Sequence, residues 1–139
     1  MRNATILVLT IRGLATEVIK NIVLAGVGKL IIADNEDVRE EDLGTGFFFR
    51  DEDVGRKVRF STSSEFSLAA LPSPPATGKL TYPHKRVDAA KSRIESLNPL
   101  VAVEAVSSYD DESLVGLVEL VDLVCVTEET RDGIVSSIL

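Results

Sequence analysis

The chain has 139 residues, 45% of them hydrophobic and 27% charged, which predicts one globular domain. Its formal net charge of −7 disfavours nucleic acid and anionic membranes as partners. No apolar run approaches the roughly 18 residues of a membrane-spanning helix, and no signal-peptide pattern precedes the first strand. The single cysteine excludes an internal disulfide and suits a reducing compartment, so we expect a soluble, intracellular protein.

The first third of the chain predicts a strand, a helix and a second strand. The continuous apolar run at residues 4–10 is typical of a strand buried on both faces of a parallel sheet. Residues 14–25 predict an amphipathic helix that ends at Gly26 and Gly28, because glycine accepts a left-handed cap. Residues 29–33 predict the second strand. The apolar stripe of the helix is expected to comprise Leu14, Val18, Ile22 and Ala25, widened by Ile19 and Val23.

The residues that follow the second strand lack a regular period. Residues 34–57 are acidic and irregular but contain Phe47, Phe48 and Phe49, of which we expect at least one to pack on the sheet and another to face a partner. Residues 58–85 hold four of the five prolines of the chain, are rich in serine and threonine, and predict a disordered insertion. Because compact domains rarely contain so long a loop, this stretch needs an explanation of its own.

The remaining residues restore the alternation of helices and strands. The expected elements are helices at residues 86–97 and 111–121, strands at residues 101–106 and 123–126, and a last helix that begins near residues 128–130. This order predicts an α/β fold with a Rossmann-like, doubly wound and mostly parallel sheet. Residues 1–57 and 86–139 are then two parts of one domain, which residues 58–85 interrupt.

A partial phosphate-binding loop follows the first strand. A working dinucleotide loop needs three glycines, for the tight turn, for the approach of the backbone to the phosphates and for helix packing. Residues 10–15 contain only Gly13, and although Arg12 could reach a phosphate, its bulk fills space that a cofactor would need. The alternative is a structural turn without a ligand. Asp34, 21 residues after Gly13, matches the acid that binds a ribose hydroxyl in this fold, or else it caps its own turn.

Other polar residues offer weaker candidate sites. Arg50, Arg56 and Lys57 could contact a triphosphate or a carboxylate, or they form a solvated surface. Residues 127–130 follow the fourth strand, where a carboxylate could bind metal or orient a ligand, or else begin a helix. Cys125 lies in an apolar strand and is expected to be a buried core residue. Since the chain has one histidine, no multi-histidine metal site is expected.

Four stretches together carry a family resemblance: RGLATEVIKNIVLAGVGKLIIAD, EEDLGTGFFFRDEDVG, RVDAAKSRIESLNPLV and DLVCVTEETRD. They resemble the ThiF-type, adenylation-fold subunits of ubiquitin-like-protein activating enzymes, above all the regulatory, smaller subunits of the SUMO branch in a fungal form. The resemblance covers nearly all of the chain except residues 58–85. The alternatives are a pseudo-half of a NEDD8- or ubiquitin-activating enzyme, and a nucleotide- or NAD-binding oxidoreductase domain.

The resemblance implies a supporting role in the ATP-dependent activation of a modifier. In this family the catalytic subunit binds ATP and Mg, adenylates the modifier and takes it onto a thiol, whereas the regulatory subunit has the same fold without the chemistry. We therefore expect no catalytic residue, metal or cofactor in this chain. We expect it to pair with the catalytic subunit of the SUMO-activating enzyme, and through it with SUMO, in the nucleus and also in the cytoplasm. Arg12, Gly13, Leu14 and Asp34 would form a degenerate nucleotide loop.

Further departures from active family members agree with that role. Ile32 replaces the first acid of a DxD motif, residues 44–46 replace an Asn-Arg-Gln triplet, and Glu128 replaces an aspartate after the fourth strand. The chain begins after the family's N-terminal arginine motif and ends before its further strands, so we expect a truncated chain that has weak activity at most or is non-functional. Deleting residues 58–85 restores a continuous family-like stretch, DVGRKRVDAAKSRIESLNPLV. We hypothesise a translated retained intron or a gene-model error, which the transcript sequence would test.

Overall fold

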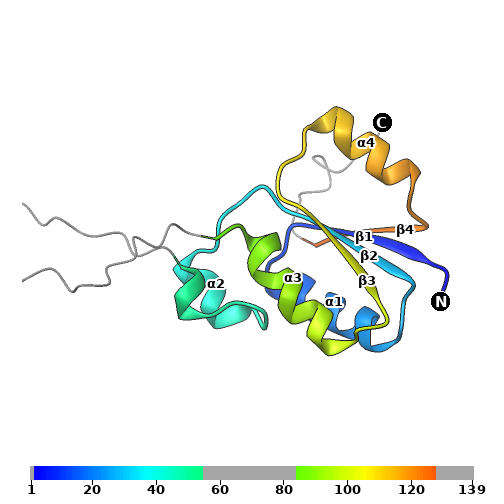
Figure 1. Cartoon of the computed structure of the whole chain (residues 1–139). Coiled ribbons are helices and arrows are strands. Elements are labelled where there is room, and N and C mark those ends of the chain that lie inside the picture. Colours follow the sequence, from blue (N-terminus) through cyan, green and yellow to red (C-terminus); the bar gives the residue numbers. More distant parts are fainter. Residues whose placement is uncertain (1, 55–83, 128–139) are drawn as a thin grey trace, which may run out of the picture.

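A four-stranded parallel sheet forms the centre of the protein (Figure 1). The computed structural model describes residues 2–54 and 84–127. The strand order is β3-β2-β1-β4 and every neighbouring pair is parallel, which confirms the predicted α/β fold class. The strands are β1 (Thr5–Leu9), β2 (Lys29–Ala33), β3 (Ala102–Val106) and β4 (Leu123–Val126).

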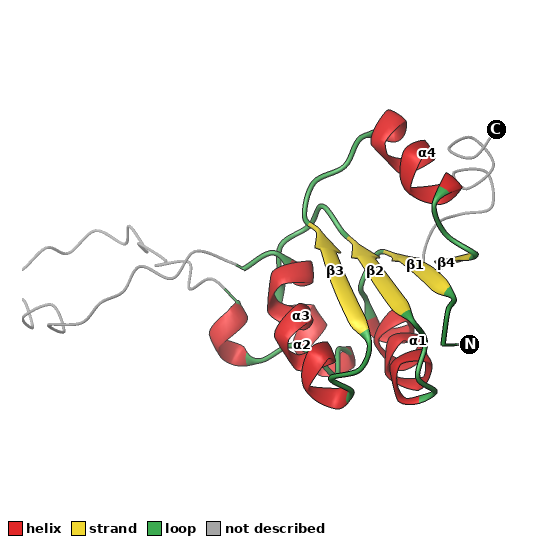
Figure 2. Ribbon diagram, turned by 45° about the vertical axis from the view of Figure 1, so that its right-hand side comes forward, coloured by secondary structure: helices red, strands yellow, loops and turns green. Residues whose placement is uncertain are grey.

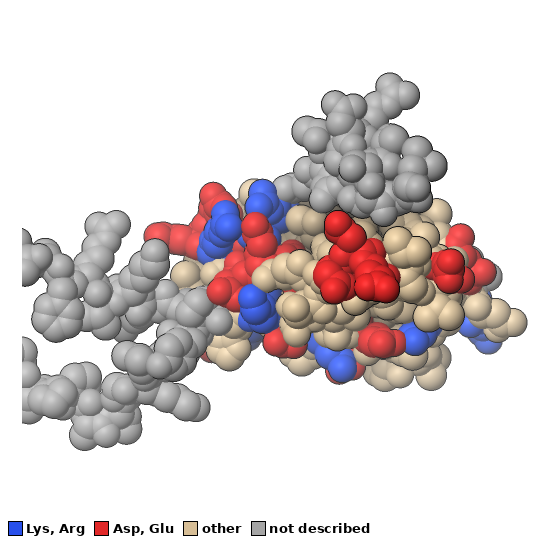
Figure 3. Space-filling view, turned by 90° about the horizontal axis from the view of Figure 1, so that it is seen from above, with Lys and Arg blue, Asp and Glu red and all other residues tan. Residues whose placement is uncertain are grey.

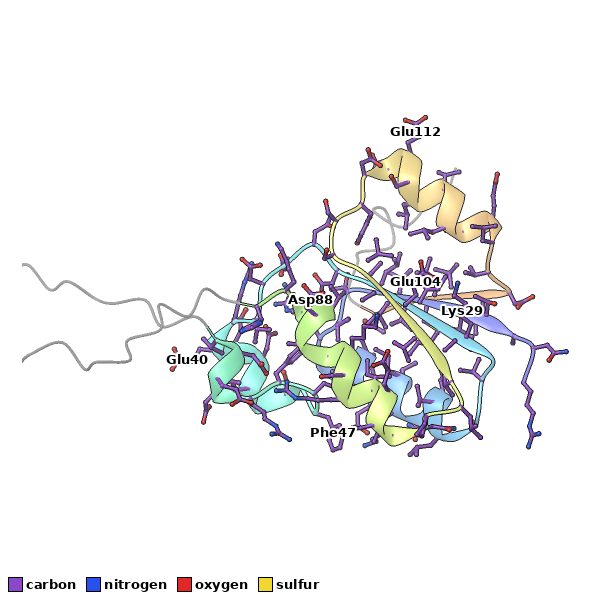
Figure 4. The ribbon with its side chains drawn as sticks, viewed as in Figure 1. Lys29, Glu40, Phe47, Asp88, Glu104 and Glu112 are labelled. Atoms are coloured by element: carbon purple, nitrogen blue, oxygen red, sulfur yellow. The ribbon has the colours of Figure 1, made fainter. Side chains whose placement is uncertain are left out.

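The two central strands are buried because their side chains are apolar on both faces. In β1 and β2 only the first residue is partly exposed, as expected for a strand that is covered on both sides. Leu7 of β1 pairs with Ile31 of β2 and with Val124 of β4. The edge strand β3 is more open, and Lys29 Nζ reaches across to Glu104 Oε2 at 2.7 Å (Figure 4). A charged edge of this kind disfavours pairing with a foreign strand.

Helices cover both faces of the sheet (Figure 2). On one face lie α1 (Gly13–Leu24) and α3 (Arg86–Leu97), whose buried residues, Ile94 among them, form the larger core with β1 and β2. On the other face lies α4 (Asp111–Glu119), where Leu114 packs in a smaller core. Helices on both faces make the sheet doubly wound, as the alternation of elements predicted.

The buried face of α1 differs from the predicted stripe by one residue. Ala15 and Ile19 are fully buried, whereas Leu14 is 62% exposed and Ala25 lies exposed beyond the helix end. The prediction was therefore wrong at Leu14 and Ala25. A shift by one residue rotates the face by about 100°, so both stripes fit the helical period, and the small Ala15 lets the start of the helix pack closely on the sheet. Gly26 ends the helix with a φ of +77°, as predicted.

Two short helices that the sequence did not predict follow β2. They are α2 (Glu40–Thr45) and the 3-10 helix η1 (Asp51–Asp53). Between them Phe48 and Phe49 are buried in the larger core, while Phe47 is 59% exposed. This confirms that at least one ring of the aromatic run packs on the core. Contact between Phe47 and a partner stays a prediction.

The chain leaves and re-enters the described fold at neighbouring points. The His84 N–H donates to the Asp53 carbonyl at 3.1 Å, and the Val38 N–H donates to the His84 carbonyl at 2.8 Å. Lys85 forms an antiparallel bridge with Asp37. The predicted insertion thus differs from the structure at its end, because His84 and Lys85 belong to the described fold. The rest of it lies outside the described residues.

The other predicted boundaries agree with the structure to within two residues. The bounds of β2, β4 and α3 are as predicted, β3 begins one residue later, and α4 ends two residues earlier. The helix predicted near residues 128–130 lies outside the described residues. In the part of the chain that the structure describes, no helix has the length and hydropathy needed to cross a membrane.

Candidate functional site

The turn after β1 is covered by neighbouring segments. Thr10 has a φ of +62°, a left-handed conformation that a β-branched residue rarely adopts. The Arg12 N–H donates to the Thr10 carbonyl at 3.2 Å, and α1 begins at the next residue. A Cβ on Gly13 would lie 3.0 Å from the Cβ of Thr45, so the end of α2 packs directly on the start of α1. Leu14 is exposed on the first turn of α1.

Asp34 joins this turn to the end of β2. Its side chain is 3% exposed. The Oδ2 atom accepts a hydrogen bond from the Ile11 N–H at 2.8 Å, and Oδ1 accepts one from the Glu36 N–H at 2.8 Å. The second bond is a turn cap, the alternative to ribose binding. Both carboxylate oxygens are engaged within the chain, at the position where this fold uses an acid to hold a ribose.

Arg86, the first residue of α3, is completely buried and binds three carboxylates. Its Nε and Nη2 donate to the two oxygens of Asp42 at 2.9 and 3.2 Å. Its Nη1 lies 2.7 Å from Glu36 Oε2 and 3.5 Å from Asp34 Oδ2. Burial opposes the charged form, but the hydrogen bond to Asp42 and the charges of Asp34 and Asp42 outweigh it and raise the pKa of Arg86.

Glu36 is the point on which three arginines converge, and we call Arg12, Arg39 and Arg86 the arginine cluster. Glu36 Oε2 lies 3.1 Å from Arg12 Nη2 and 2.7 Å from Arg86 Nη1, and Oε1 lies 3.2 Å from Arg39 Nη2. Partial burial alone would raise the pKa of Glu36. The hydrogen bonds from Arg12 and Arg86 outweigh burial, so the pKa of Glu36 lies below its ordinary value. Positive and negative side chains intermix over the side of the molecule that carries α2, and acidic ones gather over α4 (Figure 3).

A second arginine of α3 binds the other short helix. Arg93 Nη1 lies 2.5 Å from Asp53 Oδ2 and also donates to the Phe48 carbonyl. Asp53 in turn accepts from the Arg50 N–H at 2.8 Å, so the backbone of Arg50 contributes to the start of η1. Asp42 does the same for α2 by accepting the N–H of Arg39 at 2.8 Å. Each short helix thus has an aspartate that caps it and binds an arginine of α3.

The remaining candidates contribute structure rather than a second site. Cys125 is half-buried against the larger core instead of fully buried, and burial raises the pKa of its thiol, which disfavours the reactive thiolate. The Thr127 hydroxyl donates to the Thr10 carbonyl at 3.4 Å. Residues 56–57 and 128–130 lie outside the described residues. Within residues 2–54 and 84–127, no group of three or more His, Cys, Asp or Glu side chains is placed to hold a metal.

Residues 1–67 match the model of the ThiF family. The chain carries a ThiF family domain. It is 31% identical over 132 residues to the DNA damage tolerance protein RHC31 of Saccharomyces cerevisiae, covering 95% of this chain and 30% of that protein. It is 29% identical over 135 residues to the SUMO-activating enzyme subunit 1 of Homo sapiens, covering 97% of this chain and 31% of that protein. The chain therefore spans less than a third of the length of these two relatives.

Solved structures share the fold of this ThiF family domain at low sequence identity. Escherichia coli MccB in complex with ATP superposes with a TM-score of 0.68 at 16% identity, covering 99% of this chain and 33% of that chain. PaaA superposes with a TM-score of 0.64 at 20% identity, covering 90% and 31%. These likenesses bear on the fold alone. The family match and the sequence relatives confirm the resemblance to the ThiF-type family, and a fungal protein is among the relatives.

The side chains that close this site were not predicted from the sequence: Arg86, Asp42, Asp53 and Glu36. For the first three, the sequence contains patterns that could have indicated them. Arg86 precedes Ala90 by four residues and so lies on the buried stripe of α3, where a charge requires partners. Asp42 and Asp53 each end the pattern Arg-acid-Glu-Asp, which occurs twice, eleven residues apart. Glu36 gives no such signal, because its arginine partners come from three different segments.

Proposed function

We propose that this chain belongs to a non-catalytic, regulatory subunit that supports ATP-dependent activation of SUMO on a partner subunit. The partner would be the catalytic subunit of the SUMO-activating enzyme, which would supply ATP, Mg and the thiol. SUMO would be reached through that complex, in the nucleus and also in the cytoplasm. The likeness to SUMO-activating enzyme subunit 1 from several animals supports the choice of modifier.

One observation gives the main support for the proposal: both oxygens of the Asp34 carboxylate are hydrogen-bonded within the chain. Its two oxygens cap the Ile11 and Glu36 amides, and Arg86 lies beside it. A ribose would have to displace these contacts. A hydrogen bond to a ribose hydroxyl is weaker than the buried, charge-assisted contact that it would replace. The single loop glycine, Gly13, is packed against Thr45, so the backbone gives little room to phosphates.

The same observation disfavours the alternative of an NAD-binding oxidoreductase domain. That function needs a free acid at the end of β2 and an open glycine loop. Here Asp34 is buried and the loop carries Arg12, which is paired with Glu36. A pseudo-half of a NEDD8- or ubiquitin-activating enzyme would have the same closed site, so partner choice separates it from the SUMO assignment.

The proposal is tested with the full chain and two candidate partners. The chain is co-expressed with the catalytic subunit of the SUMO-activating enzyme and, as the matched control, with that of the NEDD8-activating enzyme. We expect a complex with the first alone, and no heat of ATP binding by the chain up to millimolar ATP in isothermal titration calorimetry. Binding of ATP or NAD to the isolated chain, or a complex with the NEDD8 partner instead, contradicts the assignment.

A thioester assay then measures what the chain contributes. The catalytic subunit, SUMO, ATP and Mg are incubated with and without the chain, and the SUMO thioester is followed on non-reducing gels. We expect the thioester on the catalytic subunit and not on the chain, because Asp34 and Gly13 are engaged within the fold and leave little room for a nucleotide. A SUMO thioester on the chain itself contradicts that expectation.

A further inference from the structure

We propose that Glu36 acts as a built-in anion that occupies a latent phosphate-binding site formed by the arginine cluster. Its Oε2 lies 3.1 Å from Arg12 and 2.7 Å from Arg86, and its Oε1 lies 3.2 Å from Arg39. Guanidinium groups that converge on two oxygens of one group match the recognition of a phosphate as well as that of a carboxylate. The ligand class is therefore a phosphate oxyanion, which the natural chain excludes because Glu36 fills its place.

The side chain of Arg86 and the backbones of Arg12 and Arg39 are held in place by contacts that do not involve Glu36. Arg86 is oriented by Asp42, which binds its Nε and Nη2 and leaves Nη1 aimed at Glu36. The backbone of Arg39 is fixed at the start of α2 by its bond to Asp42. Arg12 immediately precedes α1, and its carbonyl accepts the N–H of Thr16 at 2.9 Å. Removing the Glu36 side chain therefore leaves the guanidinium group of Arg86 fixed by Asp42, with Arg12 and Arg39 anchored beside it by their backbones.

The site is accessible to solvent, and in the natural chain the carboxylates around the arginines oppose the binding of a free anion. The Glu36 side chain is 40% exposed, and a shallow hollow lined by Arg39, Glu40 and Glu41 adjoins the cluster. Among the described residues, four carboxylates contact the three arginines: Asp34, Glu36, Glu41 and Asp42. Removing Glu36 takes away one of these negative charges, so the local charge that opposes an entering phosphate falls by one unit.

Competition within the chain sets the size of the effect. A carboxylate tethered at the site has an effective concentration in the millimolar range or above. A free anion must exceed that concentration to displace it, whereas in a Glu36→Ala chain it meets no competitor. The inference rests on the proposed function in one respect, namely that the natural chain does not use this site for nucleotide.

The experiment titrates inorganic tripolyphosphate into the natural chain and into Glu36→Ala by isothermal titration calorimetry at low, matched ionic strength. We expect at least tenfold tighter binding to Glu36→Ala. Glu112→Ala is the matched control, because Glu112 is an exposed carboxylate on α4, away from the arginine cluster (Figure 4). The double variant Glu36→Ala/Arg39→Ala is expected to lose the gain.

Equal affinities for the natural chain and Glu36→Ala overturn the proposal, and so does an equal gain in Glu112→Ala, which would reveal a general charge effect. Far-UV circular dichroism verifies that each variant is folded. If Glu36→Ala loses its native spectrum, Glu36→Ser is titrated under the same criterion, since its short side chain removes the carboxylate and keeps a polar group. Failure of the chain to bind a catalytic subunit would leave these results unchanged, so the two proposals fail separately.

Discussion

Replacing Arg86 by methionine should destabilise the protein far more than replacing an exposed arginine of the same network. Arg86 is completely buried and donates two hydrogen bonds to Asp42 and one to Glu36. In Arg86→Met the apolar stem is retained, so packing changes little, but the buried Asp34 and Asp42 lose their cation. Removing one partner of a buried ion pair typically costs about 3–5 kcal/mol.

The lower end of that range applies here. Asp34 keeps its two backbone donors and Asp42 keeps the N–H of Arg39, so neither carboxylate is left without hydrogen bonds. We therefore expect a loss of about 3 kcal/mol in the free energy of unfolding. Against a total of about 5–15 kcal/mol for a domain, this is a large fraction.

Urea unfolding followed by far-UV circular dichroism measures the change, since the chain contains no tryptophan. With an m-value of about 1.5 kcal/mol per molar urea, the midpoint should fall by roughly 2 M. The control is Arg39→Met, which removes the same charge from a side chain that is 53% exposed and should cost less than about 1 kcal/mol. Equal midpoints for the two variants would refute the reasoning that the buried network stabilises this region.

Three further expectations concern the same region. Because the folded-state pKa of Glu36 is lowered, its charge stabilises the protein above the ordinary glutamate pKa of about 4.3, and this contribution is lost as the pH falls through the lowered value. In Glu36→Gln the free energy of unfolding should therefore fall less steeply with acidification. An unchanged dependence on pH contradicts this. Replacing residues 56–83 by two glycines should leave the spectrum native and add about 1–2 kcal/mol through a shorter loop, and loss of the fold contradicts the insertion hypothesis. Thr10→Gly should raise the urea midpoint by relieving a left-handed φ that costs roughly 1–2 kcal/mol, whereas Thr5→Gly in β1 should lower it; a destabilised Thr10→Gly would show that φ is not the limiting strain.

The predictions succeeded where the chain encodes structure locally. The bounds of α3 follow from its apolar period and from the Asn98-Pro99 pair that ends it, and those of β2 follow from a short apolar run between a glycine and Asp34. The turn cap by Asp34 was foreseen as an alternative for the same reason, because an aspartate can bond to the amide two residues ahead.

The predictions failed where distant residues decide. The six residues of α2 include Gly44 and show no apolar period, so the sequence gives no helical signal there. Asp42, which caps that helix, is held by Arg86 across 44 residues of chain. The choice of buried face on α1 has the same origin, since Leu14 and Ala15 fit the period equally well and only the packed sheet distinguishes them.

The two arginines of α3 connect the turn after β1 to the two short helices that follow β2. Arg86 and Arg93 are seven residues apart, so they lie on one face of the helix, and they bind the aspartates that cap the two short helices after β2. The hydrogen bond from His84 to Asp53 brings the described residues on either side of residues 55–83 together, next to the Arg93–Asp53 pair. Arg86 also holds Glu36 beside Arg12, at the turn where phosphates would bind. The contacts that fasten these short helices are therefore the same contacts that fill the site.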